Sequence, residues 1–271
     1  MFRERAGVAL LLLPVGFWII AQGGWLFAVA VTCVLGWAGR EYARLFEANG
    51  QRPATWLIVV GIVALAASRF LTQFEFAPLI LSVAALGCLT WHLVDYERGA
   101  PRSGTDFAIS LAGIVYLGWI GAFLISLRQL PSGEWWLLLI LPVVWFADTA
   151  AYLVGKAIGR HRLSPRLSPK KTWEGYVAGI VFGGLSGALF ASLWVPGADP
   201  ISFRPSLGFP IGLGLGALTP LGDLGISMMK REIRVKDTGS LLPGHGGVLD
   251  RIDSWLWAGV LGFYAVTWAL H

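Results

Sequence analysis

The sequence predicts an all-α, multi-pass integral membrane protein. Of its 271 residues, 56% are hydrophobic and only 14% are charged, whereas about 25% of residues in a typical soluble domain are charged. Apolar runs long enough to cross a bilayer as helices recur along the whole chain. No polar stretch is much longer than about thirty residues, so a soluble enzyme with a membrane tail is excluded. A single membrane domain over 1–271 is expected.

Nine apolar segments are expected to form the membrane helices, with polar connections between them. In chain order they lie near 7–21, 25–39, 54–68, 77–94, 107–127, 134–154, 175–195, 207–228 and 254–270. Most approach the roughly 17–25 residues that cross a bilayer. The first two are short and closely spaced, so they can instead form one tight hairpin, which leaves eight spans. Cys33 and Cys88 both lie in apolar runs, so no disulfide framework is expected.

The basic residues predict the orientation in the membrane. If the N-terminus is cytoplasmic, all of the 21 Lys and Arg residues except Arg69, Arg128 and Arg204 fall in cytoplasmic segments. The positive-inside rule favours this orientation. The two long charged loops, 155–174 and 229–253, then face the cytoplasm. We therefore expect a multi-pass protein of the cell (inner) membrane whose active site faces the cytoplasm.

The stretch 223–253 is the densest polar segment, and it separates the last two apolar segments. Its acids are Asp223, Glu232, Asp237, Asp250 and Asp253, and its bases are Lys230, Arg231, Arg234, Lys236 and Arg251. It is also rich in glycine, which ion pairs alone do not require. Glycine lets a backbone approach a phosphate closely and present its N–H groups. A site that holds phosphates and a divalent metal at a membrane surface accounts for both features.

One helix face begins this stretch. Asp223, Ser227, Lys230 and Arg231 are spaced i, i+4, i+7 and i+8, so they share a face of a helix. A carboxylate and a hydroxyl suit Mg²⁺, whose coordination shell is completed by water and substrate phosphates. The alternative is a pore lining or a salt-bridged helix end.

A glycine-rich loop and two carboxylates follow that helix. Gly246 and Gly247 are expected to approach a phosphate. His245 is expected either to contact a phosphate or transfer a proton, or to brace the loop with a hydrogen bond. Asp250 and Asp253 lie at the start of the last helix, where capping of the helix is the structural alternative to metal binding.

The second candidate region precedes residue 175. Asp148 lies inside an apolar run, where an acid is costly and marks a functional site, unless it reaches the interface or bonds to another helix. Ser168 and Pro169 match an N-cap and the first position of a helix. Lys170 and Lys171 would then lie in the first turn and form an anion site. An anionic lipid headgroup would also be attracted there, and ordinary positive-inside charge is the alternative.

Taken together, these residues indicate a class of chemistry. Two cytoplasmic loops and membrane acids can bring Mg²⁺ and several phosphates together at the bilayer surface. In-line phosphoryl or nucleotidyl transfer needs such a metal ion and positioned phosphates, and it needs no covalent protein intermediate. No nucleic-acid partner is expected.

The motifs resemble those of the phosphatidate cytidylyltransferases, also called CDP-diacylglycerol synthases. The family signature is matched by Ser227-x-Met229-Lys230-Arg231, Lys236-Asp237-x-Gly239, Leu242-Pro243-x-His245-Gly246-Gly247-Val248 and Asp250-Arg251-Ile252-Asp253. An upstream block, from Asp148-Thr149 to Thr172-x-Glu174-Gly175, is similar to a second block of the family. The motifs cover the expected catalytic portion, 148–253, and residues 1–140 carry none. Family members often have an acid where this chain has Ile226, so any contribution of that acid to cation binding is absent.

The resemblance implies a reaction in which CTP and phosphatidic acid give CDP-diacylglycerol and pyrophosphate. It also implies Mg²⁺, room for a monovalent cation such as K⁺, surrounding membrane lipid and a homodimer. The catalytic residues it implies are Asp223, Ser227, Lys230 and Asp250. The metal ligands are Asp223 and Asp250, with Asp148 and Asp253 as further candidates. The substrate-binding residues are Ser168, Lys170, Lys171, Thr172, Arg231, Lys236, Asp237, His245, Gly246, Gly247 and Arg251.

Two other functions fit parts of the pattern. A transporter of a phosphorylated metabolite or cation would also use membrane acids, but it predicts charge distributed through the membrane and repeated halves. Here the charge gathers on one side and no repeat is present. The Asp-Gly-x2-Ala-Arg motif of CDP-alcohol phosphotransferases is absent, so the remaining enzymatic alternative is a CTP-dependent lipid-phosphorylating enzyme.

Overall fold

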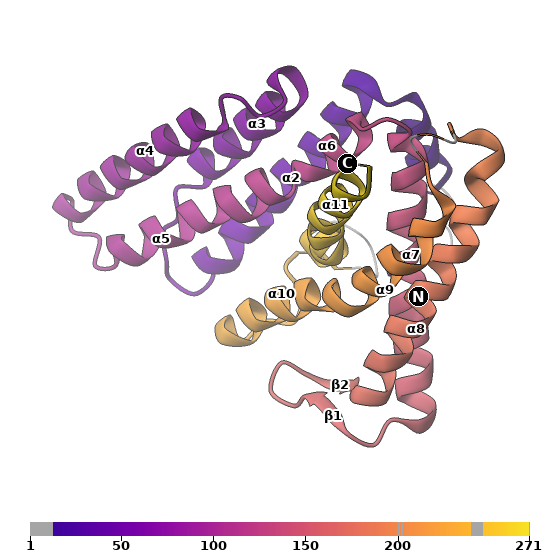
Figure 1. The fold of residues 1–271 in the computed structure, drawn as a ribbon. Helices are drawn as coiled ribbons and strands as arrows, with labels where there is room; N and C mark the ends of the chain where they lie inside the picture. The colour runs from indigo at the N-terminus through magenta and orange to yellow at the C-terminus, as the bar shows by residue number, and fades with distance from the viewer. Residues whose placement is uncertain (1–12, 200, 202, 240–245, 271) are drawn as a thin grey trace. The chain divides into compact units, whose positions relative to one another are not determined.

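The computed structural model describes residues 13–199, 201, 203–239 and 246–270 (Figure 1). The described chain is mainly helical, and one short hairpin of two strands interrupts the series of helices along the chain. Six of its helical stretches are long and apolar enough to cross a membrane: Thr55–Thr72, Ala77–Glu97, Ser103–Gln129, Gly133–Ile158, Trp173–Gly197 and Pro205–Ile233. The prediction of an all-α membrane protein is therefore confirmed, and the count of nine spans stays a prediction.

The expected apolar segments coincide with helices along most of the chain. The first segment lies partly outside the described residues, and its described part is the helix Leu13–Gln22. The segment expected over 207–228 differs, because the structure divides it into α9 (Gly208–Leu218) and α10 (Pro220–Ile233). Pro220 is the first residue of α10, a position that suits proline because it has no N–H to donate to the preceding turn. The helix that carries Asp223 therefore begins just before it.

The chain forms two compact units, each containing part of the predicted catalytic portion. Unit 1 comprises Met1–Ser126 and Glu232–Ile252, and unit 2 comprises Leu127–Arg231 and Asp253–His271. The helices of unit 1 are the helix Leu13–Gln22, α2 (Gly24–Glu47), α3 (Thr55–Thr72), α4 (Ala77–Glu97), α5 (Ser103–Gly113) and the π-helix Ile114–Ile120. Helix α6 (Phe123–Gln129) begins in unit 1 and ends in unit 2.

Close contacts at small residues pack the helices of unit 1. Leu35, Ile58, Ile62 and Leu65 are fully buried apolar side chains of α2 and α3. The Tyr42 hydroxyl donates a hydrogen bond to the Ile109 carbonyl at 3.1 Å, which joins α2 to α5. A Cβ atom at Gly113 would lie 2.8 Å from the Tyr42 ring, so this position has no room for a larger residue.

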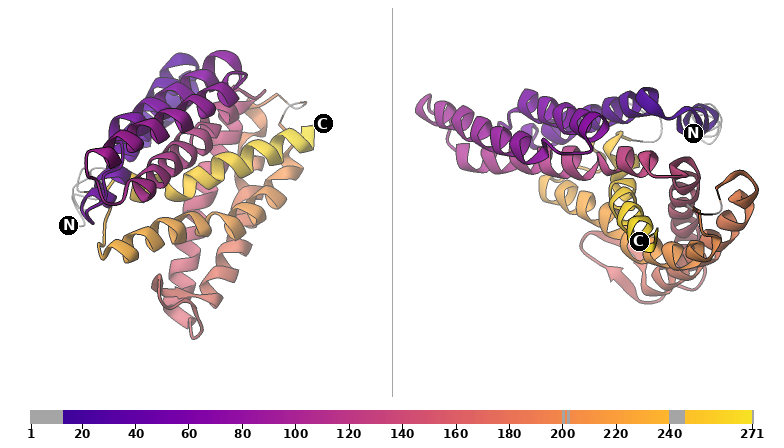
Figure 2. Two further views of the ribbon diagram at one scale, coloured as in Figure 1. Left: turned by 90° about the vertical axis from the view of Figure 1, so that its left-hand side faces the viewer. Right: turned by 45° about the horizontal axis from the view of Figure 1, so that its top comes forward.

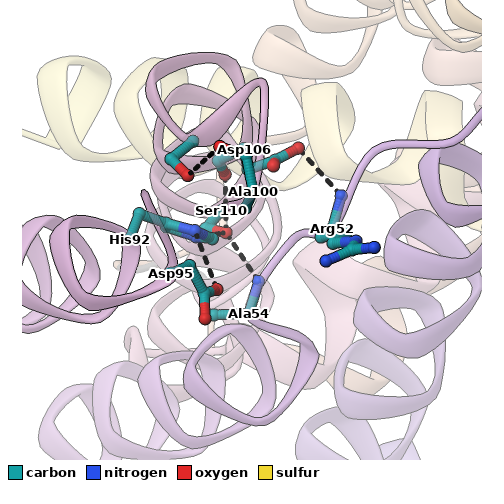
Figure 3. A network of polar contacts seen from close by, with 8 residues as sticks. Arg52, Ala54, His92, Asp95, Ala100, Asp106 and Ser110 are labelled. Atoms are coloured by element: carbon teal, nitrogen blue, oxygen red, sulfur yellow. Dashed lines mark hydrogen bonds and ion pairs between the residues drawn. The ribbon is translucent and has the colours of Figure 1, made fainter. Parts of the chain in front are cut away.

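A buried polar network fixes the loop between α2 and α3 (Figure 3). The Ser110 hydroxyl donates to the Asp106 carbonyl at 2.8 Å and accepts from the Ala54 N–H at 2.9 Å. Because its one proton is used, His92 Nε2, 3.0 Å away, must be the donor to Ser110. The Asp106 carboxylate accepts from the Arg52 N–H at 2.8 Å. The network therefore satisfies the backbone of the loop that follows α2.

Unit 2 contains α7 (Gly133–Ile158), β1 (Arg162–Ser164), β2 (Ser168–Thr172), α8 (Trp173–Trp194), α9 and most of α10. It also contains most of α11 (Leu249–Leu270), which begins in unit 1. Helices α8 and α9 approach at backbone distance through glycines. A Cβ atom at Gly183 would lie 2.6 Å from the Gly212 carbonyl oxygen, and one at Gly216 would lie 2.6 Å from that of Gly179. Such small-residue contacts are a common means of packing membrane helices.

A β-hairpin replaces the helix start predicted at Ser168. Residues 168–172 form β2, which pairs antiparallel with β1, so the assignment of Ser168 as an N-cap was wrong. Helix α8 begins at Trp173, and its N-cap is Thr172, whose hydroxyl accepts a hydrogen bond from the Gly175 N–H at 3.2 Å. Figure 2 shows that the hairpin extends beyond the adjacent ends of α7 and α8. Lys170 and Lys171 therefore lie on a strand and not in a helix turn.

Candidate active site

An ion pair joins the two motif blocks within unit 2. Lys171 Nζ of β2 lies 2.5 Å from Asp223 Oδ2 in the first turn of α10. The side chains are 28% and 34% exposed, so a charged ligand can reach both of them. The Ser227 hydroxyl lies one helical turn further along α10 and donates to Asp223 Oδ1 at 3.4 Å. The predicted common face of Asp223 and Ser227 is confirmed.

A second link holds the same hairpin to α10. The Arg231 Nε–H donates to the Leu167 carbonyl oxygen at 3.3 Å, so the turn between β1 and β2 is attached to the end of the helix. The hairpin is also held at its base, where His161 Nδ1 and Glu174 Oε1 lie 2.7 Å apart. Lys171 is therefore presented to Asp223 by a strand with several anchoring contacts.

Two more carboxylates are close enough to this pair to interact with it electrostatically. Asp148, on α7, interacts with Lys171 and Asp223. Asp253, on α11, interacts with Asp223, Lys230 and Asp148. The first turn of α10 packs on the start of α11, because a Cβ atom at Gly222 would collide with the Asp253 carbonyl oxygen. Four elements of unit 2, α7, β2, α10 and α11, thus contribute to one charged cluster.

Asp253 has the least solvent contact of the three acids in this cluster, which are Asp148, Asp223 and Asp253. It is buried and lies just before the apolar part of α11. Burial, together with the nearby negative charge of Asp223, raises the pKa of Asp253 to about 7, although its hydrogen bond from the Ser254 N–H acts in the opposite direction. Lys230, which also interacts with Asp253, is itself buried. A divalent cation at this cluster would favour the ionised carboxylate.

The cluster suits Mg²⁺ in its donor chemistry. Among the described residues, no group of three or more His, Cys, Asp and Glu side chains is arranged as a ready-made metal cage. Mg²⁺ does not require one, since it keeps several waters and is bound by one or two carboxylates together with substrate phosphates. The ammonium of Lys171 lies against Asp223 as its counter-charge. Asp223, Asp148 and Asp253 are the residues of unit 2 that could hold the ion.

Asp250 belongs to unit 1 and has a different environment. Its Oδ2 atom accepts hydrogen bonds from the Thr238 N–H at 2.8 Å, the Thr238 hydroxyl at 3.0 Å and the Gly247 N–H at 3.1 Å. These bonds tie the start of α11 to the segment that follows α10. The role of Asp250 as a metal ligand stays a prediction.

The glycines of the predicted phosphate loop are partly explained by this arrangement. Gly246 has φ +81°, which a non-glycine residue rarely adopts. A Cβ atom there would lie 3.1 Å from an Asp250 carboxylate oxygen and 3.5 Å from one of Asp237. Gly247 is buried. Their predicted contact with a substrate phosphate is not tested by the structure.

The remaining predicted substrate-binding residues are distributed over both units. Lys170 is exposed on β2, whereas Thr172 is buried as a helix cap and Ser168 is paired opposite Ser164. Lys236, Asp237 and Arg251 are exposed in unit 1. His245 lies outside the described residues.

One buried acid, Glu41, was not predicted as a site residue from the sequence. It lies near the end of α2, and its Oε2 accepts from the Leu249 N–H at 2.9 Å. An acid next to the polar end of an apolar helix was its only sequence signal.

Comparison with known proteins identifies the family. A model of the cytidylyltransferase family matches residues 3–269 of the chain. The chain belongs to the cytidylyltransferase family. This membership covers the N-terminal half as well, although that half carries no motif that the sequence reasoning recognised.

Relatives of this cytidylyltransferase family member align over nearly the whole chain. The phosphatidate cytidylyltransferase of Synechocystis sp. is 32% identical, and the alignment covers 98% of this chain and 97% of the relative. That of Pseudomonas aeruginosa is 34% identical, with 99% and 98% covered. That of Brucella suis is 33% identical, with 96% and 91% covered.

Proposed function

We propose that this protein transfers the cytidylyl group of CTP to phosphatidic acid and forms CDP-diacylglycerol and pyrophosphate. Family membership over residues 3–269 and the phosphatidate cytidylyltransferases that align with it support this activity. The observation that carries the assignment to a site is the Lys171–Asp223 pair, since it brings one residue from each motif block together. Asp148, Asp253 and Lys230 complete the charged cluster around that pair.

The reaction balances without a covalent enzyme intermediate. An oxygen of the phosphatidic acid phosphate attacks the α-phosphorus of CTP, and a new phosphoanhydride bond forms. The bond from the α-phosphorus to the oxygen that bridges to the β-phosphate breaks, and pyrophosphate leaves with that oxygen and its electron pair. A phosphate monoester is already anionic near neutral pH, so the attack needs no general base. The protein contributes positioning and charge neutralisation.

The lysines neutralise the phosphates in this proposal. When the triphosphate binds, Lys171 exchanges the Asp223 carboxylate for a phosphate oxygen, and Asp223 becomes available as a metal ligand. Lys230 and Lys170 supply further positive charge, and Ser227 donates to Asp223 or to a phosphate. The bound Mg²⁺ would supply Lewis-acid stabilisation of the phosphate charge, with Asp148 and Asp253 as its further ligands.

The other predicted residues remain proposals that rest on the motifs. Asp250 is assigned to the metal, and Arg231, Lys236, Asp237, His245, Gly246, Gly247 and Arg251 are assigned to the substrates. Ser168 and Thr172 shape the hairpin and the start of α8, so their contribution to substrate binding is indirect. A monovalent cation such as K⁺ next to Mg²⁺ and a homodimer are further proposals, and both follow from the family resemblance.

The site is proposed to face the cytoplasm from the inner membrane. Nine spans with a cytoplasmic N-terminus leave both long charged loops on the side where CTP is available. Asp253 lies near the start of α11, directly after the charged stretch that follows α10, whereas Asp223 lies in the first turn of α10 and Asp148 lies within α7. Phosphatidic acid in the same leaflet can then present its headgroup to the cluster.

A direct assay tests the proposed function. Purified protein in detergent is supplied with CTP, phosphatidic acid and Mg²⁺, and CDP-diacylglycerol and pyrophosphate are quantified together. Equal amounts of both products are expected, with none when either phosphatidic acid or Mg²⁺ is omitted. Folded protein that forms neither product under these conditions would refute the proposal.

A further inference from the structure

Glu41 is a buried carboxylate that the proposed chemistry does not use. It lies near the end of α2, and its side chain is 5% exposed. Its Oε1 atom accepts from the Trp37 indole N–H at 3.2 Å. Its Oε2 atom accepts from the Leu249 N–H at 2.9 Å and lies 3.4 Å from the Thr238 hydroxyl. A buried acid is tolerated only with such partners, because the loss of hydration is costly.

Two motif glycines make room for this carboxylate. A Cβ atom at Gly239 would lie 2.6 Å from Glu41 Oε1. One at Gly247 would lie 2.5 Å from Glu41 Oε2 and would collide with the Thr238 hydroxyl. Any larger residue at either position would therefore displace Glu41 or the loop backbone. These two glycines, one on each side of residues 240–245, are required by an acid that lies about 200 residues earlier in the chain.

Thr238 connects Glu41 to Asp250. The Thr238 hydroxyl lies 3.0 Å from Asp250 Oδ2 and 3.4 Å from Glu41 Oε2. A hydroxyl has one proton, so it can donate fully to only one of these two carboxylates. When Asp250 gives up this hydrogen bond, Glu41 is in place to receive it. The free-energy cost of moving the Asp250 carboxylate from Thr238 to a cation is thereby reduced, since the buried Thr238 hydroxyl still has an acceptor in Glu41.

Glu41 also holds the helix that carries Asp250. Its bond from the Leu249 N–H satisfies one of the donors that the first turn of α11 leaves without a helical partner. Leu249 is fully buried and directly precedes Asp250. The two contacts of Glu41 Oε2 thus fix Leu249, which directly precedes Asp250, and Thr238, which donates a hydrogen bond to Asp250.

We propose that Glu41 is a positioning residue for cytidylyl transfer. It touches no substrate and acts through Thr238 and Leu249 to orient the Asp250 carboxylate. The inference rests on the proposed function and on the metal role that the motif assigns to Asp250. It places part of the active-site support in the N-terminal half of the chain, where no motif is present.

The test is Glu41→Gln, which keeps the size of the side chain and removes its charge and one of its two acceptor oxygens. We expect kcat to fall by roughly 10- to 100-fold, as for the loss of a hydrogen bond to a charged group. The Mg²⁺ concentration for half-maximal rate should rise several-fold, while KM for phosphatidic acid stays unchanged. Glu41→Asp, which keeps the charge, should recover part of the rate. The matched control is Glu47→Gln on the same helix, since Glu47 is exposed and bonds to Thr55.

A second variant keeps the inference testable if Glu41→Gln does not fold. Thr238→Val removes the shared hydroxyl and leaves the bond from Leu249 to Glu41 in place. It should also lower kcat and raise the Mg²⁺ requirement, and in the double variant the two losses in kcat should not multiply. A purely structural Glu41 predicts lower thermal stability with wild-type kcat and Mg²⁺ requirement per folded molecule, and that result, in either variant, overturns the inference. Fully multiplicative losses overturn it as well. If the wild-type protein forms no CDP-diacylglycerol, the proposed function fails instead.

Discussion

Lys171 Nζ lies 2.5 Å from Asp223 Oδ2, so a lysine of the upstream motif block neutralises an aspartate of the downstream block. The residues are 52 positions apart in the sequence and on different elements, β2 and α10. The pair gives unit 2 a preformed cation next to an oxygen ligand. Triphosphate binding is therefore expected to exchange the partners of both residues.

Asp223→Asn tests the carboxylate of this pair. The substitution keeps the shape of the side chain and removes its charge, so metal-assisted stabilisation of the transferring phosphate should be lost. We expect kcat to fall at least about 100-fold, with the thermal midpoint in detergent close to that of the wild type. Glu232→Gln, an exposed acid of the same helix, is the control and should retain activity. Near-normal turnover of the Asn variant would remove Asp223 from the metal site.

Lys171→Met tests the cation. Loss of one charge-assisted contact to a phosphate should lower kcat/KM for CTP by roughly 10- to 100-fold. Lys171→Arg should keep more activity, because it retains the charge. Lys156→Met on α7 is the control, since Lys156 is an exposed lysine at the end of an adjacent helix. Equal losses for Lys156→Met and Lys171→Met would indicate a general charge effect and contradict the specific role of Lys171.

The Mg²⁺ requirement should depend on pH through Asp253. Its pKa is raised to about 7, so below pH 7 the carboxyl is mostly protonated and a metal ion must displace the proton. The Mg²⁺ concentration for half-maximal rate should therefore increase as the pH falls, by up to about tenfold per unit below pH 7. The measurement is a Mg²⁺ titration of the rate between pH 6 and 8. The Asp253→Asn variant shows how much of this pH dependence comes from the substrates alone. If the Mg²⁺ requirement depends on pH identically in the variant and the wild type, a role for Asp253 is contradicted.

The α8–α9 contact gives a stability prediction. Gly212→Ala places a methyl group against the Gly183 carbonyl, and such overpacking costs about 1–3 kcal/mol. The thermal midpoint should fall by roughly 2–4 °C for each kcal/mol lost. Gly214→Ala is the control on the same helix, because a Cβ atom there meets no other atom within 4 Å. It should be neutral or slightly stabilising, since alanine favours a helix. Equal midpoints for the two variants would contradict the tight packing.

Much of the helical architecture was predictable because it depends on local hydropathy. Long apolar runs must form helices in a bilayer, and Pro220 marks the start of α10 in the sequence itself. The β-hairpin was missed, because Ser168-Pro169 matches a helix start and the pairing with Arg162–Ser164 is a tertiary choice. Thr172, followed by Glu174 in the first turn, was the better N-cap signal.

The site was predictable in its residues and not in its contacts. Spacing on one helix placed Ser227 beside Asp223, and the structure confirms that contact. No local pattern could pair Lys171 with Asp223 or Glu41 with Leu249, since these contacts join segments far apart in sequence. The glycine density of the downstream motif was interpreted as phosphate binding alone. At Gly239 and Gly247, the structure supplies a steric reason in Glu41.

The most direct test of cytidylyl transfer follows one phosphorus atom. CTP is labelled at either the α-phosphorus or the γ-phosphorus, and purified protein in detergent is supplied with phosphatidic acid and Mg²⁺. Transfer of the cytidylyl group predicts that the α-label enters the lipid and the γ-label appears only in pyrophosphate. Entry of the γ-label into the lipid would show phosphorylation instead, and it would contradict the account.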